Sequence, residues 1–307
     1  MDIALQGAVS QGILWGIMVL GVFITFKLLD IPDLTVDGSF ATGGCVAAVA
    51  IVVFKMDPIA AILLATLAGG IAGAITGFLH TVFEIPAILA GILTQIGLWS
   101  VNLRIMGKSN TPLLNSSTVF SSLSNATGIP QSTITAILGI IIAVVIVAIL
   151  YWFFGTEIGS ALRATGDNED MVRALGVSTA KTKMIALTLS NALVGLSGGL
   201  IAESQKYADI GMGTGAIVIG LAAIVIGEVL GRLLPGKLSW FGARLISAVV
   251  GSVVYFLIRA IVLQLGLDAN DMKLFSAILV ALALCVPVVW EKIRLRSGYK
   301  KGVEEHA

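Results

Sequence analysis

Polar side chains are rare in this chain, and several stand inside long apolar runs where their chemistry would matter most. They are Gln95, Asn102, Ser190, Asn191, Glu228, Arg259 and Gln264. A polar group among apolar residues either hydrogen-bonds to a neighbouring helix or borders a route for solutes. Gln95 and Asn191 lie deepest in their runs, whereas Glu228 lies near the end of one and Arg259 can extend its guanidinium outward. These positions indicate transport or helix packing.

The residue patterns of enzymes are absent from the sequence. It contains no Walker-type phosphate-binding loop, no cluster of metal-ligating residues and no paired carboxylates deep in an apolar run. His80 and His306 are far apart, and Cys45 and Cys285 lie in apolar runs, which argues against a disulfide framework or a cysteine metal site. We therefore expect no cofactor, no metal and no catalytic residue, and energy for any transport would come from another polypeptide.

The composition requires most of the surface to face lipid. Hydrophobic residues make up 57% of the chain and charged residues 12%, with a mean hydropathy of +1.00. A soluble domain carries about 25% charged residues, so this chain cannot build a water-facing surface. The net charge of +1 provides no basic field for nucleic acid. We predict an all-α fold, a polytopic transmembrane helical bundle embedded in membrane lipid.

Apolar runs of membrane-spanning length predict about nine transmembrane helices, within a range of eight to ten. We expect residues 1–290 to form a single transmembrane domain and residues 291–307 to form a basic tail. Two of the runs, Phe40–Phe54 and Gly215–Leu230, are short for a full crossing. The nine runs are Gly12–Leu29, Phe40–Phe54, Ile59–Leu79, Ile85–Leu103, Ile134–Phe154, Met184–Ala202, Gly215–Leu230, Ala243–Leu265 and Leu274–Val289.

The distribution of Lys and Arg predicts the orientation in the membrane. If the loop Gly155–Lys183 is cytoplasmic, about thirteen basic residues lie inside and about five outside. The C-terminus is then cytoplasmic, and nine spans place the N-terminus outside. The longest connection, Arg104–Thr133, is rich in Ser, Thr and Asn and would lie outside as an ordered or semi-ordered loop.

The segment Leu28–Phe40 interrupts the first apolar region. Pro32 ends a helix, Asp37 or Ser39 can cap the next one, and Gly38 allows a tight turn. Two interpretations stay open. The segment is either a broken helix that lines a solute path, as in many transporters, or an ordinary cytoplasmic loop.

The loop Glu157–Lys183 contains a short helix of about two turns with well-defined ends. Asp167 or Asn168 can cap its start, and Gly176 can end it. Glu169 and Asp170 complement the positive helix end, and Met171, Val172, Ala174 and Leu175 supply an apolar face. The helix would either insert into a groove on a cytoplasmic partner or rest on the membrane surface.

Small residues four positions apart would let helices approach closely, either within the chain or between two copies. We favour packing within the chain. The glycines concerned are Gly12 and Gly16, Gly69, Gly73 and Gly77, Gly195 and Gly199, and Gly227 and Gly231.

The cytoplasmic loop resembles the coupling-helix region of bacterial ABC importer permeases of the branched-chain amino acid and ribose type. It reads L-R-A-T-G-D-N-E-D-M-V-R-A-L-G-V-S-T-A-K-T-K-M-I-A-L and is followed by S-N-A-L-V-G-L-S-G-G-L. The early L-T-V-D-G-S-F-A-T-G-G is similar to that family's Asp-Leu-Ser-Val-Gly-Ser segment. The resemblance covers most of the chain, and the coupling loop is its specific part. The chain departs from the sugar-transporting group in lacking a basic N-terminal segment and an extra first span.

This resemblance implies a permease subunit in a bacterial plasma membrane. Its partners would be a dimer of cytoplasmic ABC ATPases, an extracytoplasmic solute-binding lipoprotein and a second permease copy, which makes a homodimer or a heterodimer. The solute would be small, either an amino acid or sugar-like. The ATPase-coupling residues would be Asp167, Asn168, Glu169, Asp170, Met171, Val172, Arg173, Ala174, Leu175 and Gly176. The translocation path would include Thr35, Asp37, Gly38 and Ser39 of the early segment. The two deep polar residues, Gln95 and Asn191, would complete it.

Two other functions remain as alternatives. A stand-alone secondary transporter or channel would use Asp37, Glu84 or Glu228 as its coupling group. A membrane-embedded enzyme would need a polar catalytic cluster, which the sequence does not contain.

Overall fold

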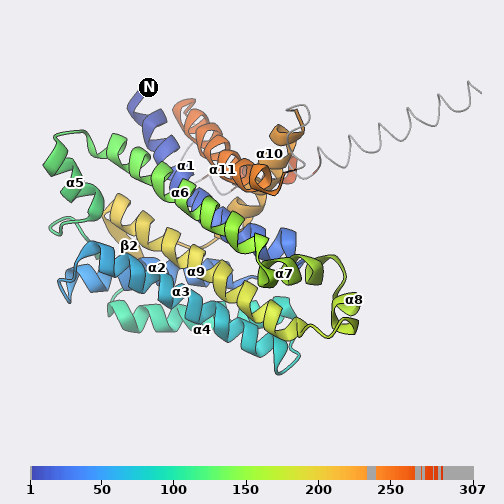
Figure 1. Cartoon of the computed structure of the whole chain (residues 1–307). Coiled ribbons are helices and arrows are strands. Elements are labelled where there is room, and N and C mark those ends of the chain that lie inside the picture. Colours follow the sequence, from blue (N-terminus) through green and yellow to red (C-terminus); the bar gives the residue numbers. More distant parts are fainter. Residues whose placement is uncertain are drawn as a thin grey trace, which may run out of the picture.

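The computed structural model describes residues 2–233, 240–266, 271, 274–278, 280–282 and 285. Nearly all of this part is helical, which confirms the predicted all-α fold (Figure 1). The elements in chain order are α1 (Asp2–Val22), the π-helix η1 (Phe23–Leu28), α2 (Thr35–Val52), α3 (Pro58–Thr81), α4 (Ala87–Met106), β1 (Asn110–Pro112), α5 (Val119–Thr127), α6 (Gln131–Gly155), α7 (Glu157–Asp167), α8 (Glu169–Ala174), α9 (Thr179–Gln205), β2 (Tyr207–Asp209), α10 (Ala216–Leu233) and α11 (Phe241–Gln264).

The predicted spans correspond to long helices. Within the described residues, seven helical stretches are long and apolar enough to cross a membrane, and Ala216–Gly231 in α10 is a shorter apolar helix. These eight match the first eight predicted runs. The ninth run, Leu274–Val289, is described only in part, at residues 274–278, 280–282 and 285, and the predicted tail 291–307 lies entirely outside the described residues.

The short elements divide between the two ends of the bundle. Figure 1 shows α5 and β2 at one end of the long helices, and α7 and α8 at the opposite end. At the first end, β1 pairs antiparallel with β2, with Thr111 opposite Ala208. Helix α5 begins with a capping box formed by Thr118 and Ser121. The predicted loop Arg104–Thr133 is therefore an ordered cap made of a strand and a helix.

Helix α9 runs through the middle of the bundle against α1, α2 and α3. Close approach of these helices depends on glycine. A Cβ atom on Gly195 would lie 2.6 Å from the Ala65 carbonyl oxygen of α3, and one on Gly43 of α2 would collide with the Gly195 backbone. A Cβ on Gly12 of α1 would lie 2.7 Å from Val253 Cα of α11. These contacts confirm that the glycine pairs pack helices within the chain.

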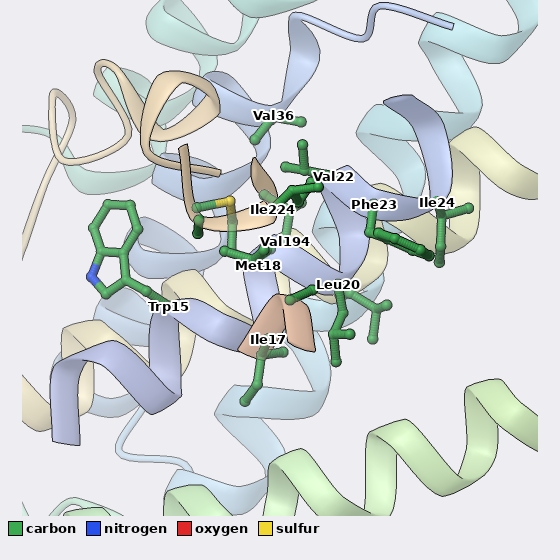
Figure 2. Packing of buried hydrophobic residues seen from close by; sticks show 14 of the residues in the cluster. Trp15, Ile17, Met18, Leu20, Val22, Phe23, Ile24, Val36, Val194 and Ile224 are labelled. Carbon is green, nitrogen blue, oxygen red and sulfur yellow. The ribbon is translucent and has the colours of Figure 1, made fainter. Parts of the chain in front are cut away.

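The largest apolar cluster surrounds α1 and η1. Figure 2 shows Ile17, Met18 and Leu20 of α1 near Val194 of α9 and Ile224 of α10. Trp15 stands at the edge of this cluster. The helices α3, α4 and α6 instead expose many large apolar side chains, for example Leu67, Ile96 and Trp152. Such faces suit a lipid environment, in which apolar exposure carries no penalty.

The interruption between the first two spans is shorter than predicted. Helix α2 begins at Thr35, so Thr35, Gly38 and Ser39 lie in its first turns and only Leu29–Leu34 is non-helical. The cap predicted at Asp37 or Ser39 is wrong, because the backbone N–H of Thr35 donates to Asp33 Oδ1 at 2.9 Å. Leu34 occupies the N-cap position, and Asp33 just before it supplies the acceptor for the first N–H of the helix.

Candidate translocation site and coupling helix

Two helices begin inside the bundle rather than at its ends. Asp33, at the start of α2, accepts a hydrogen bond from Asn191 Nδ2 at 2.7 Å, and Asn191 lies near the midpoint of the 27-residue helix α9. Helix α10 begins after the turn Ile210–Gly215, and its first turn lies against Asp37 of α2. A helix start at this depth exposes backbone N–H groups where water is scarce, so each start needs a protein acceptor.

The carboxylate of Asp37 supplies that acceptor for α10. Gly215 N–H donates to Asp37 Oδ2 at 2.9 Å, and Ile217 N–H donates to Asp37 Oδ1 at 2.9 Å. Gly215 has a φ of +84°, a conformation that favours glycine, and it ends the turn that leads into the helix. Gly213 packs directly on the Asp37 backbone, where a Cβ would not fit. Asp37 therefore joins α2 to α10 through the positive end of a helix.

Thr35 and Asn191 belong to a second polar group next to Asp33. Thr35 Oγ1 lies 2.7 Å from Thr76 Oγ1, and Thr76 donates to Thr94 Oγ1 at 2.9 Å. All five residues are buried. The hydroxyl chain joins α2, α3 and α4, so the cluster holds the start of α2 in place. Sequence reasoning missed Thr76 and Thr94, since single hydroxyls in apolar runs look like ordinary helix residues. It missed Asp33 because nothing local in the segment Leu28–Phe40 distinguishes its carboxylate from the others.

The other predicted path residues meet around a small cavity. Asp37, Gly38 and Gln95 line a space of about 60 Å³ together with Trp99, Asn102 and Thr214. Ligand pockets are usually about 300 Å³ or larger, so this space does not hold a solute in the observed conformation. Ser39 is buried on another side of α2, and its hydroxyl has no hydrogen-bond partner among the described residues.

A larger cavity of about 610 Å³ opens toward the end of the bundle that carries the strands. Its wall includes Trp15, Phe40 and Phe256, and Arg259 lies with them. Thr214 of the turn Ile210–Gly215 lines both this cavity and the small one. The turn that Asp37 holds in place is therefore the partition between the two spaces.

The short helix predicted in the loop Glu157–Lys183 is present as α8, with ends that differ slightly from expectation. Asn168 is the N-cap, and its side chain accepts from Met171 N–H at 3.0 Å. Asp167 is instead the last residue of a separate helix α7, which the sequence did not predict. Gly176 has a φ of +83° and follows the helix as a stop, and Leu175 is the C-cap.

One acidic residue fixes α8 to the bundle. Glu169 accepts from Lys183 Nζ of α9 at 2.6 Å and from Arg173 at 2.8 Å. The hydrogen bond from Lys183 holds the pKa of Glu169 below its usual value. Val172 is buried, whereas Met171 and Leu175 are 52% and 73% exposed. The helix is therefore anchored on one side and presents apolar side chains on the other.

Two further ionisable groups have structural partners. Glu228 of α10 forms an ion pair with Lys27 of η1 at 2.8 Å. Glu203, near the end of α9, accepts from Val119 N–H of α5 at 2.8 Å, which attaches α5 to the bundle. Sequence reasoning missed Glu203 because it directly follows the apolar run that was predicted to end at Ala202.

Comparison with known proteins gives a consistent result. The family model described as "Branched-chain amino acid transport system / permease component" matches residues 4–286. The chain is 36% identical over 271 residues to the tyrosine transport system permease protein of Clostridioides difficile (strain R20291), covering 88% of this chain and 87% of that protein. It is 26% identical to the ribose import permease protein RbsC of Escherichia coli (strain K12), covering 88% and 81%. It is 25% identical to the probable branched-chain amino acid transport permease protein LivH of Methanocaldococcus jannaschii, covering 94% of each. No solved structure matches the chain significantly.

The family match supports the resemblance seen in the coupling loop. It identifies the chain as a transport permease subunit, not an enzyme, and supports an importer subunit and not a stand-alone transporter. Membership implies an ATPase and a binding protein as partners, because a permease component is one part of a transport system. Together with the helical bundle, these matches show that the chain belongs to the branched-chain amino acid transport permease family and is the multi-pass membrane subunit of an ATP-binding-cassette importer.

Proposed function

We propose that two copies of this chain form the path by which an importer carries a small solute, an amino acid, into a bacterial cell, and that α8 docks on the ATPase. The observation that carries the proposal is the pair of exposed apolar side chains, Met171 and Leu175, on a short helix that is fixed to α9. A short helix that is held rigidly in this way can transmit movement from an ATPase to the membrane helices.

The attachment of α8 supports its role in transmitting force. Lys183, which holds Glu169, lies in the first turns of α9, and α9 packs on α1, α2 and α3. Helix α7 also packs on the end of the first span, because Gly166 fits against the Leu28 backbone. A displacement of α8 would therefore move α9 and the non-helical segment after Leu28 together.

The proposed path passes the partition between the two cavities. It begins in the cavity of about 610 Å³, passes the turn Ile210–Gly215, and continues past Asp37, Gly38 and Gln95. Of the remaining predicted path residues, Thr35 and Asn191 position the start of α2 in this proposal, whereas Ser39 makes no hydrogen bond of that kind within the described part of the chain. Release of the Asp37 contact with Gly215 would join the two cavities.

The two-fold symmetry of an ATPase dimer supports a second copy of the permease chain. An ATPase dimer offers two equivalent docking grooves, and each permease chain supplies one α8. The apolar faces of α3, α4 and α6 provide surface for contact with a partner or with lipid. We place α8 and the C-terminus on the cytoplasmic side, and α5 with the strands outside, in agreement with the Lys and Arg distribution.

A test of the docking role replaces the two exposed side chains of α8. The double variant Met171→Ser, Leu175→Ser should insert normally but retain less than about one tenth of the ATPase in a pull-down from membranes, because it loses the apolar contact. Uptake in proteoliposomes should fall with it.

The matched control is Leu114→Ser. Leu114 is 73% exposed, as Leu175 is, but lies with β1 at the opposite end of the bundle. It should leave ATPase binding unchanged. Full ATPase retention by the double variant would disprove the docking role of α8.

A further inference from the structure

The polar and apolar side chains that line the cavity of about 610 Å³ lie in different parts of it. Three helices each place a polar side chain one turn closer to the strand-bearing end than an apolar one: Gln11 and Trp15 in α1, Gln205 and Ile201 in α9, and Arg259 and Phe256 in α11. The polar groups therefore gather at the mouth, and the apolar groups gather deeper.

The deeper part is built from aromatic rings. The ring centroids of Trp15 and Phe40 are 4.6 Å apart, and those of Trp15 and Phe256 are 5.5 Å apart. The three rings come from α1, α2 and α11, so they hold one another in fixed orientations. In Figure 2 the indole of Trp15 stands apart from the other labelled side chains of the cluster. A planar apolar group in the cavity could pack on the parts of these rings that line it.

The mouth carries one positive charge. Arg259 lies with its guanidinium 5.8 Å from the centroid of the Phe256 ring, which orients it. Among the described residues it forms no ion pair, and the described lining of the cavity contains no carboxylate. Gln11 and Gln205 add amide groups that can both donate and accept. This combination suits a carboxylate next to a hydrogen-bonding group.

We propose that this cavity binds an amino acid with an aromatic side chain, its carboxylate on Arg259 and its ring on Trp15 and Phe256. The proposal deepens the proposed function, on which it rests, by naming the substrate class and the residues that select it. A guanidinium pairs with a carboxylate through two parallel hydrogen bonds. The ammonium group of the amino acid would meet the amide oxygens of Gln11 and Gln205.

A sugar fits this cavity less well. Its hydroxyl groups point outward all round the ring, so those that enter the aromatic part would lose hydrogen bonds to water without replacing them. An aliphatic amino acid would fill the apolar part but would not stack on the rings. D-ribose and L-leucine are therefore the competitors that the experiment must include.

The experiment uses the complete complex, with its ATPase and binding protein, in proteoliposomes. Uptake of tritiated L-tyrosine, L-leucine and D-ribose is measured with and without ATP. The wild-type complex should take up L-tyrosine, and Arg259→Gln should reduce that uptake by about tenfold or more, because the charge-assisted pair is lost. Arg259→Lys should recover part of it. Arg104→Gln, which removes an exposed cation from the end of α4 outside the cavity, should match wild type.

A second measurement tests the site without transport. The thermal midpoint of the purified full-length permease is followed with L-tyrosine near its solubility limit in neutral buffer, because a ligand that binds the folded state raises it. L-tyrosine should raise the midpoint of wild type and Arg104→Gln but not of Arg259→Gln. Trp15→Leu should reduce the difference between L-tyrosine and L-leucine.

The outcomes separate this inference from the importer function. ATP-dependent uptake of L-leucine or D-ribose without L-tyrosine would overturn the substrate class and leave the importer intact. L-tyrosine uptake that Arg259→Gln does not change would overturn the assigned site. A shift of the midpoint by L-tyrosine that requires Arg259 would support the site even if the ATPase failed to couple.

Discussion

Asp33 and Asp37 are four residues apart, yet each satisfies the start of a different helix. Asp33 caps its own helix α2, whereas Asp37 reaches across to Gly215 and Ile217 at the start of α10. The sequence predicted a functional role for Asp37 but not its partner, which lies about 180 residues away along the chain. Local patterns show which residue can cap a helix, but they do not show a cap that is supplied by another segment.

Substitution of Asp37 tests this contact. Asp37→Asn keeps the shape of the side chain but turns one acceptor into a donor, so one backbone N–H of α10 loses its partner at a cost of about 1–3 kcal/mol. We expect a lower thermal midpoint in detergent and reduced uptake. Asp30→Asn is the matched control, because Asp30 is exposed and asparagine also tolerates its φ of +55°. Equal effects of the two substitutions would mean that the contact of Asp37 with the start of α10 contributes nothing specific.

The ion pair of Glu169 predicts how the anchoring of α8 depends on pH. Lys183 lowers the pKa of the Glu169 carboxyl in the folded chain, so the contact stabilises α8 at pH values above the usual value of 4.5. It is lost as the pH falls through the lowered pKa. Hydrogen exchange of α8 should therefore stay slow from neutral pH down to the usual value of 4.5 and become faster only at lower pH, after correction for the intrinsic rate.

Glu169→Gln provides the comparison for that profile. It removes the titrating group, so α8 should exchange faster already at neutral pH and show no further step on acidification. Asp170→Asn, on the same helix but outside the ion pairs of the described residues, should follow wild type. A step of the same size in Glu169→Gln would mean that another group controls the anchoring.

At the scale of elements, apolar length and glycine spacing predicted most of the fold. Eight predicted runs match helices because hydropathy reports the thickness of the membrane directly. The exact starts of α2 and α10 could not be predicted, since they depend on Asp33 and Asp37 in three dimensions. Helix α7 was missed because only Gly159, Leu162 and Thr165 are buried, too few to produce a clear apolar pattern.

The packing of α2 against α9 gives a prediction for glycine substitution. Gly43→Ala would place a methyl group on the Gly195 backbone, and overpacking typically costs about 1–3 kcal/mol or more when backbone must move. We expect loss of the monodisperse peak in fluorescence-detected size-exclusion chromatography. Gly97→Ala in α4 has open space around its Cβ and should be neutral or slightly stabilising. Normal behaviour of Gly43→Ala would show that α2 and α9 are less tightly packed.

At the scale of the whole molecule, the two ends of the bundle have different tasks in the proposed importer. The end with β1, β2 and α5 receives the solute and opens into the larger cavity, and the end with α7 and α8 meets the ATPase (Figure 1). The Lys and Arg count predicts which end faces which side because membrane insertion follows that bias, and cysteine labelling would test this orientation. The solute class could not be predicted in the same way, since the rings and Arg259 come from separate spans.

Cysteine labelling checks this orientation. Cys285 is exposed and Cys45 is buried, so both are first replaced by serine or alanine. Ser117→Cys, near α5, should react with a membrane-impermeant maleimide in intact cells. Asp170→Cys, on α8, should react only after the cells are opened. The reverse pattern would place α8 outside and exclude contact with a cytoplasmic ATPase.

The link from Asp37 to the start of α10 also bears on how the chain is made. Synthesis runs from the N-terminus, so Asp37 has entered the membrane long before Gly215 leaves the ribosome. The carboxylate that accepts from α10 is therefore already in the membrane when α10 is inserted. If α10 were inserted before Asp37, its first N–H groups would have no acceptor. Helix α10 should therefore be among the last helices to settle, and loss of Asp37 should leave it open to quality-control proteases while the earlier helices are already assembled.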